Sequence, residues 1–134
     1  MHLSFSKKVL IFNCFLFLSL TVIFYKFLKF NKLTKATTSL SRVILSKKIS
    51  DLKASEINDF HLKVGKIFFN FSCLPLCISA KLLLSIYGYE TKIQSGIKLK
   101  EKNIKGHAWL VMKDNKLLNK NENIKDYQKS FMID

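Results

Sequence analysis

The sequence predicts a single α+β domain in which helices come first and an antiparallel sheet follows. Up to Gly88, apolar residues occur in unbroken runs or at spacings of three and four, as in helices. After Gly88 they alternate with polar residues, as in strands. The chain has 134 residues, of which 49% are hydrophobic, so its length suits one core. We expect residues 1–50 to form an N-terminal helical segment of the same fold, and residues 51–134 to form its core.

The first predicted helix spans about residues 7–30 and contains an uncharged run from Val9 to Tyr25. These 17 residues are at the lower limit for crossing a bilayer, and lysines flank both ends. A signal peptide would share the basic start, but no small-x-small cleavage pattern follows. A buried helix of a soluble core would also be apolar on all sides. Periodicity alone slightly favours the membrane, and the choice between a spanning and a buried helix stays open.

Two more helices are expected before the central part of the chain. One covers about residues 34–48 and begins with a polar run. The other covers about residues 56–69, where apolar residues recur every three or four positions, as on one face of an amphipathic helix. Ser55 is its predicted N-cap.

The next helix is predicted to start at Cys73, because Pro75 suits a first helical turn and Gly88 suits a helix end. A thiol at a helix N-terminus is readily ionised, since unpaired backbone N–H groups and the helix dipole favour the thiolate. Cys73 is therefore a candidate nucleophile, although a lone cysteine is commonly just a small buried hydrophobe. Cys77 lies one turn later. A Cys-x3-Cys metal or redox site with two histidines as further ligands is the weaker alternative.

Alternating residues predict the strands of the sheet. The first runs over about residues 93–99. The second runs over residues 107–112, and because both of its faces are apolar we expect it to be central in the sheet. A return strand over residues 117–120 and a closing helix over residues 124–131 are expected to complete the domain.

His107 starts the second predicted strand, and Gly106 before it allows a close approach of another segment. An imidazole there can reach the N-terminus of a helix packed across the sheet edge. Cys73 and His107 are therefore a candidate nucleophile and base, which would need a third group to hold the imidazole ring. The alternative is a histidine that only fills space beside Trp109.

The length of the loop after this strand decides which side chain could hold the ring. A two-residue loop would put Asn119 on the face opposite His107. A three-residue loop, residues 113–115, would instead pair Trp109 with Asn119 and put Asn119 diagonally across from His107 on the same face. Asn121 would then lie directly opposite His107 and is the fallback. An amide oxygen can accept the imidazole N–H and fix its tautomer.

The charge is strongly positive and unevenly distributed. Lysine and arginine number 23 against 9 acidic residues, for a formal net charge of +14. Residues 1–50 carry nine of the basic residues and no acidic one, which leaves fourteen basic and nine acidic residues in the remainder. Such a field favours an acidic peptide, a phosphate-bearing molecule or anionic lipid, although a lysine-rich surface is commonly only a solvated face. We expect no nucleic-acid partner, because only the net charge supports one.

The cysteine count points to a reducing compartment. Three cysteines make an odd number in a chain without a plausible disulfide framework, so a cytoplasmic location is the better prediction.

Two stretches resemble a known family. They are CLPLCISAKLLLSIYGYETKIQSGIKL and GHAWLVMKDNKLLN, and they are similar to the transglutaminase-like domain of lasso-peptide biosynthesis B proteins, which are leader peptidases related to the microcin-processing protein. The family pattern is Cys-Leu on a leucine-rich helix, a glycine, a strand with a Gly-Val-like pair, and then His-Ala-Trp before a hairpin. Matching residues occur in that order from Cys73 to Trp109, and the resemblance covers about residues 70–132. The length resembles that of the split, peptidase-only members.

This resemblance implies a transglutaminase-like (papain-like) core with a catalytic helix packed on a small antiparallel sheet. It implies a cysteine (thiol) protease without metal or cofactor, with Cys73 as nucleophile and His107 as general base. The third catalytic residue of the family is usually aspartate, and in this sequence Asn119 is aligned with it. Backbone amides at the helix N-terminus would bind the oxyanion, with Asn70 as an extra donor.

The resemblance also implies a role in the maturation of ribosomally made antibiotic peptides of the bacteriocin type. The enzyme would cut a lasso-peptide precursor at its leader–core junction, together with a small leader-binding protein and a lasso cyclase. It favours a buried helix at residues 7–30, while membrane association through residues 9–25 stays open. The alternative is a membrane-anchored or peripheral basic protein whose transglutaminase-like domain is inactive or transfers acyl groups.

Overall fold

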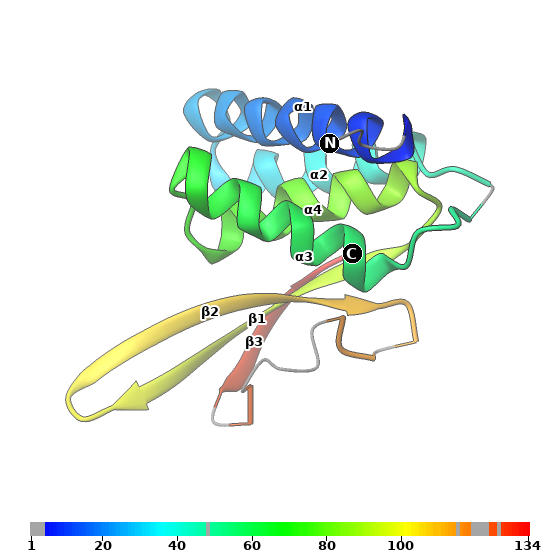
Figure 1. The fold of residues 1–134 in the computed structure, drawn as a ribbon. Helices are drawn as coiled ribbons and strands as arrows, with labels where there is room; N and C mark the ends of the chain where they lie inside the picture. The colour runs from blue at the N-terminus through cyan, green and yellow to red at the C-terminus, as the bar shows by residue number, and fades with distance from the viewer. Residues whose placement is uncertain (1–4, 48, 115, 119–123, 126) are drawn as a thin grey trace.

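The computed structural model describes residues 5–134 except 48, 115, 119–123 and 126. In these residues the predicted α+β order is confirmed, with helices first and a three-stranded antiparallel sheet after them. The helices form a layer on one side of the sheet (Figure 1). In chain order the elements are α1 (Phe5–Phe27), α2 (Phe30–Val43), α3 (Ala54–Val64), the π-helical turn η1 (Gly65–Phe69), α4 (Cys73–Ile86), β1 (Thr91–Lys100), β2 (Asn103–Met112) and β3 (Gln128–Ile133).

The core is built around α4, which contacts α1, α2, α3, β1 and β2. Every residue of α4 from Pro75 to Ser85 is buried, which suits its high content of leucine and other apolar residues. The buried Lys81 donates a hydrogen bond from its Nζ to the carbonyl oxygen of Thr91 and so ties α4 to β1. Burial lowers the pKa of Lys81 to about 8. The helix ends as predicted, because Gly88 adopts a positive φ of 87°, which a side chain would disfavour.

The apolar helix α1 is packed against α4 along one stripe only. The side chains on this stripe recur at spacings of three and four, and they are Leu10, Cys14, Phe17, Leu18 and Thr21. Burial raises the pKa of the Cys14 thiol to about 12. The opposite side of α1 remains exposed and apolar. By length and composition alone, the segment Ser6–Phe27 could also cross a membrane.

Helix α3 begins earlier than expected. The predicted N-cap at Ser55 is wrong, because Lys53 has the extended conformation of an N-cap and Ser55 lies inside the first turn of α3. At its other end α3 continues into η1. Gly65 makes this junction possible, since a Cβ added to it would lie 2.2 Å from Leu76 Cδ2 and 3.2 Å from Leu18 Cδ2. The turn therefore packs closely on both α4 and α1.

The sheet has the order β2-β1-β3, so the prediction that the second strand is central is wrong. Strand β1 is central, and β2 pairs with it over its whole length in an antiparallel hairpin. The outer face of β2 is apolar for another reason. Trp109 is covered by Tyr127, whose ring centroid lies 6.1 Å from that of the indole, and only 2% of Trp109 is exposed. The indole is therefore buried by contact with Tyr127 and not by a central position of β2 in the sheet.

The C-terminal segment differs from its prediction, since Gln128–Ile133 form strand β3 and not a helix. This strand pairs antiparallel with β1, whose free edge offers hydrogen bonds that override a weak local preference.

The turn after β2 follows the three-residue register. Val111 pairs with Leu117, and the backbone N–H of Met112 donates to the carbonyl oxygen of Lys116 at 2.8 Å. The return strand was predicted over residues 117–120. In the described residues it is represented by this bridge at Leu117, and residues 119 and 120 lie outside the described part of the chain.

Candidate active site

Cys73 is the first residue of α4, directly after the N-cap Ser72. The Ser72 side chain makes no capping hydrogen bond, and the first helical bond of this end runs from the N–H of Leu76 to the carbonyl oxygen of Ser72 at 3.3 Å. The backbone N–H groups before Leu76 therefore project from the helix end, beside the partly exposed Cys73 thiol. Such groups favour a thiolate and can bind an oxyanion.

One cavity of about 120 Å³ brings the predicted pair together. Cys73 and His107 both line it, from α4 and β2 respectively. The other lining residues come from the same two elements, from α3 and η1, and from the segment before α4; they are Asn58, Leu62, Lys66, Phe71, Leu76, Cys77, Ala108, Trp109 and Leu110. The cavity thus lies between the helix layer and the edge strand β2.

The His107 ring is held in an aromatic group on one face of β2. Its centroid lies 5.9 Å from that of Trp109, with the rings nearly parallel at 29°, and 5.4 Å from that of Tyr127. His107 and Trp109 share this face by strand alternation, while Ala108 and Leu110 point into the helix-side core. The cavity is bordered by residues of both faces.

Gly96 makes room for this aromatic group. It pairs with His107 across the β1–β2 hairpin, and a Cβ on it would lie 2.8 Å from Trp109 Cη2 and 3.1 Å from the Gln128 carbonyl oxygen. Gly96, the glycine of the Gly-Val-like pair in the family pattern, therefore has a physical role here, because the indole that stacks on His107 lies against the bare backbone of β1.

Among the residues that the structure describes, no further predicted site residue lines the cavity. Asn70 ends η1 in a left-handed conformation, with φ 50°, and its side chain is exposed; it is not one of the described residues that line the cavity. Asn119 and Asn121 lie outside the described residues. The observed turn register is the one that would pair Trp109 with position 119 if the bridge at Leu117 continued.

Sequence reasoning missed two polar residues on the cavity wall. Asn58 is buried, with 2% exposure, and Lys66 is exposed on η1 at the cavity. With Leu62 they form the series i, i+4, i+8, which places them on one helix face toward the cavity. In the sequence Asn58 lies between Ile57 and Asp59, so no local signal marked it as part of this wall.

Tyr25 of α1 is a third residue whose position near Cys73 no sequence pattern indicated. Burial, together with the nearby thiols of Cys73 and Cys77, raises the pKa of Tyr25 to about 12, so its phenol is neutral at physiological pH. Residues of the first helix thus come near the start of α4, which local sequence patterns could not indicate.

The alternative Cys-x3-Cys metal site gains no ligand from His61. This histidine is fully buried between α3 and α4, where its Nε2 lies 2.7 Å from Ser79 Oγ. Burial lowers its pKa to about 4. In the part of the chain that the structure describes, no group of three His, Cys, Asp or Glu side chains is arranged to hold a metal ion.

A helix N-terminal thiol and a strand histidine on one cavity, in an α+β domain, are an arrangement that also occurs in thiol-dependent acyl-transfer and hydrolysis proteins. The comparison with protein families agrees with this class. The family model of the transglutaminase-like superfamily matches residues 22–132, and the chain belongs to that superfamily. Its members are often cysteine peptidases or acyltransferases. Comparisons with curated proteins and with solved structures gave no match.

Proposed function

We propose that this protein is a cysteine peptidase that removes the leader from a ribosomally synthesised lasso-peptide precursor. The observation that carries the proposal is the common cavity of Cys73 and His107, in a chain of the transglutaminase-like superfamily. The finer assignment to lasso peptides is supported by the resemblance of the Cys-Leu helix and the His-Ala-Trp strand.

In the proposed reaction His107 takes the proton of the Cys73 thiol, and the sulfur attacks the carbonyl carbon of the scissile peptide bond. The backbone N–H groups at the start of α4 stabilise the negative oxygen that develops. The carbon–nitrogen bond then breaks, and the His107 imidazolium gives its proton to the departing amine of the core peptide. A water molecule, deprotonated by His107, hydrolyses the remaining thioester and releases the leader with a free carboxylate.

Two features of the cavity fit this chemistry. The stack of Trp109 and Tyr127 limits the rotation of the His107 ring, and the proposed reaction requires that ring to come within hydrogen-bond reach of the sulfur when the substrate binds. Asn119, or Asn121 in its place, is the proposed acceptor for the second imidazole N–H. An amide in that role stabilises the imidazolium less than the carboxylate usual in the family, so we expect a slower enzyme than one with aspartate.

The proposed partners follow from the same resemblance. A small separate protein would bind the leader and present the precursor, and a cyclase would close the ring on the freed core amine. The reaction would take place in the cytoplasm. The positive charge of Lys66 at the cavity favours a precursor with an acidic residue near the scissile bond.

The proposal is tested by incubating the purified protein with a candidate precursor and a candidate leader-binding protein, and following leader release by mass spectrometry. Cys77→Ala is the matched control for Cys73→Ala, because both thiols line the cavity one helical turn apart. We expect Cys73→Ala to abolish release and Cys77→Ala to retain most of it. Release by the Cys73→Ala protein would refute the proposed nucleophile.

Acyl transfer is the second candidate, and the superfamily includes acyltransferases. Reaction in ¹⁸O-labelled water separates the two chemistries, because hydrolysis puts one labelled oxygen into the leader carboxylate. A product in which the leader acyl group is joined to an amine, without the label, would favour acyl transfer over the peptidase.

A further inference from the structure

The outward side of α1 is a continuous apolar stripe. Its residues recur at helical spacing on the side opposite the stripe that packs on α4. Only 28% of the apolar segment is buried within the protein, so most of a helix with a mean hydropathy of 2.0 remains available for other contacts. The exposed fractions are 37% for Val9, 67% for Phe12, 50% for Leu16, 52% for Ile23 and 73% for Phe27.

The stripe continues onto η1. Ile67 and Phe68 are 74% and 66% exposed, and the ring of Phe68 lies 5.3 Å from that of Phe15 on α1. We name the combined surface the α1 face, consisting of Val9, Phe12, Leu16, Ile23, Phe27, Ile67 and Phe68. In Figure 1, α1 is on the side of the helix layer away from the sheet, and within the described part of the chain the α1 face is not covered by another element. An apolar surface of this extent marks a site of interaction.

The charges around the α1 face identify its partner. Lys7 and Lys8 lie at one end of α1, and Lys26 and Lys29 at the other, all four exposed. Residues 1–50 contain nine basic residues and no acidic one. Lysines at the ends of an apolar helix face can extend their amines to lipid headgroups while their stems stay in the apolar layer. We propose that the α1 face binds the surface of an anionic lipid bilayer, with α1 lying in the plane of the headgroups.

The packing of α1 explains why the helix would lie on the bilayer and not cross it. To span a membrane, α1 would have to leave α4 and expose the apolar side chains of Leu10, Cys14 and Leu18, together with the core that they cover. The hydrogen bond from Asn13 Nδ2 to the Tyr87 hydroxyl, 3.2 Å long, would also be lost. A helix lying flat on the bilayer keeps these contacts, and the lipid buries the α1 face as well.

The proposal can be tested with the full-length protein and lipid vesicles. Flotation with vesicles of phosphatidylcholine, alone or mixed with phosphatidylglycerol, measures the bound fraction. We expect binding to the mixed vesicles that weakens with added salt, and a roughly tenfold loss of affinity in Phe12→Glu and in Leu16→Glu. Both side chains are exposed, so circular dichroism should show an unchanged fold.

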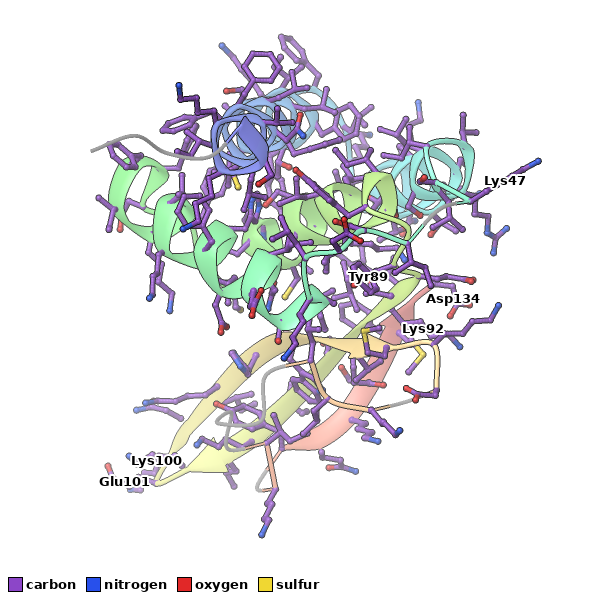
Figure 2. The ribbon with its side chains drawn as sticks, turned by 45° about the vertical axis from the view of Figure 1, so that its right-hand side comes forward. Lys47, Tyr89, Lys92, Lys100, Glu101 and Asp134 are labelled. Carbon is purple, nitrogen blue, oxygen red and sulfur yellow. The ribbon has the colours of Figure 1, made fainter. Side chains whose placement is uncertain are left out.

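Leu99→Glu is the matched control. It makes the same change at a side chain that is 74% exposed, near the tip of the β1–β2 hairpin. Figure 2 shows this tip, at Lys100 and Glu101, far from the helix layer. We expect this variant to bind vesicles like the wild-type protein. Loss of binding in Leu99→Glu but not in the α1 variants would overturn the proposal.

Two further results would also refute it. A dimer in sedimentation velocity that Phe12→Glu converts to a monomer, without binding of the wild type to vesicles, would assign the α1 face to a second copy of the chain. Resistance of the cellular protein to extraction from membranes by alkaline carbonate would assign α1 to the bilayer interior. Vesicle binding should not require peptidase activity, so we expect Cys73→Ala to bind vesicles like the wild-type protein.

Discussion

Acid should destabilise this protein through one histidine, His61. In the folded state burial lowers its pKa from 6.5 to about 4, so the folded protein resists protonation of this ring while the unfolded chain does not. The stability gained by a neutral His61 is therefore present above pH 6.5 and is lost as the pH falls toward 4. From the pKa values of the folded and unfolded states, linkage predicts that the free energy of unfolding is about 2 kcal/mol lower at pH 5 than at neutral pH.

The measurement is urea unfolding followed by the fluorescence of Trp109, the single tryptophan of the chain, at pH 7.5 and at pH 5. Other groups also titrate in this interval, so wild type is compared with His61→Gln, which cannot be protonated. We expect the wild type to lose about 2 kcal/mol more than the variant between the two pH values. Equal losses would show that His61 is not held neutral by burial between α3 and α4.

Two glycine substitutions test the packing that supports the cavity. Gly65→Ala should lower the free energy of unfolding by about 1–3 kcal/mol, since the new methyl group would overlap Leu76, and urea unfolding measures this loss. Gly106→Ala is its control and should be nearly neutral, because no described residue outside its chain neighbours has an atom within 4 Å of the added Cβ, contrary to the close approach expected there. Gly96→Ala should displace the Trp109 ring, shifting its fluorescence and slowing leader release in the cleavage assay; unchanged values of both would contradict the proposed support of His107.

The elements with strong local patterns were predicted well from the sequence. The start of α4 at Cys73 and its end before Gly88 were predicted from a proline suited to a first turn and a glycine suited to a left-handed position. The change from helical to alternating spacing located β1 and β2. These signals lie within a few residues of the feature that they indicate, so no tertiary information was needed.

The failures occurred where tertiary contacts decide the structure. Strand β3 forms because β1 offers it an edge, which the local sequence of residues 128–133 does not report. Strand β2 is apolar on both faces because Tyr127, from a distant segment, covers Trp109. The same limit applies to the site, where Lys66 and Tyr25 come near Cys73 only because α1, η1 and α4 pack together.

The hydrophobicity of α1 has two separate causes that a sequence pattern cannot distinguish. A helix that is apolar on all sides fits both a buried position and a membrane, and in this fold its two sides have different surroundings. One stripe is needed for packing on α4, and the other is exposed. This division is visible only once α4 is in place, which is why composition left the choice open.

The turn η1 connects the candidate active site with the α1 face. Lys66 lines the cavity, and the next two residues, Ile67 and Phe68, belong to the exposed apolar surface. Gly65 fixes this turn against Leu76 of α4, only three residues after Cys73, so the two surfaces are joined through a closely packed junction. Because the turn cannot tilt without disturbing that junction, a bilayer bound at the α1 face would hold the cavity close to the headgroups. Under the proposed function, a precursor would then approach Cys73 along the membrane surface, where the charges of the precursor and of Lys66 are both subject to the anionic lipid field.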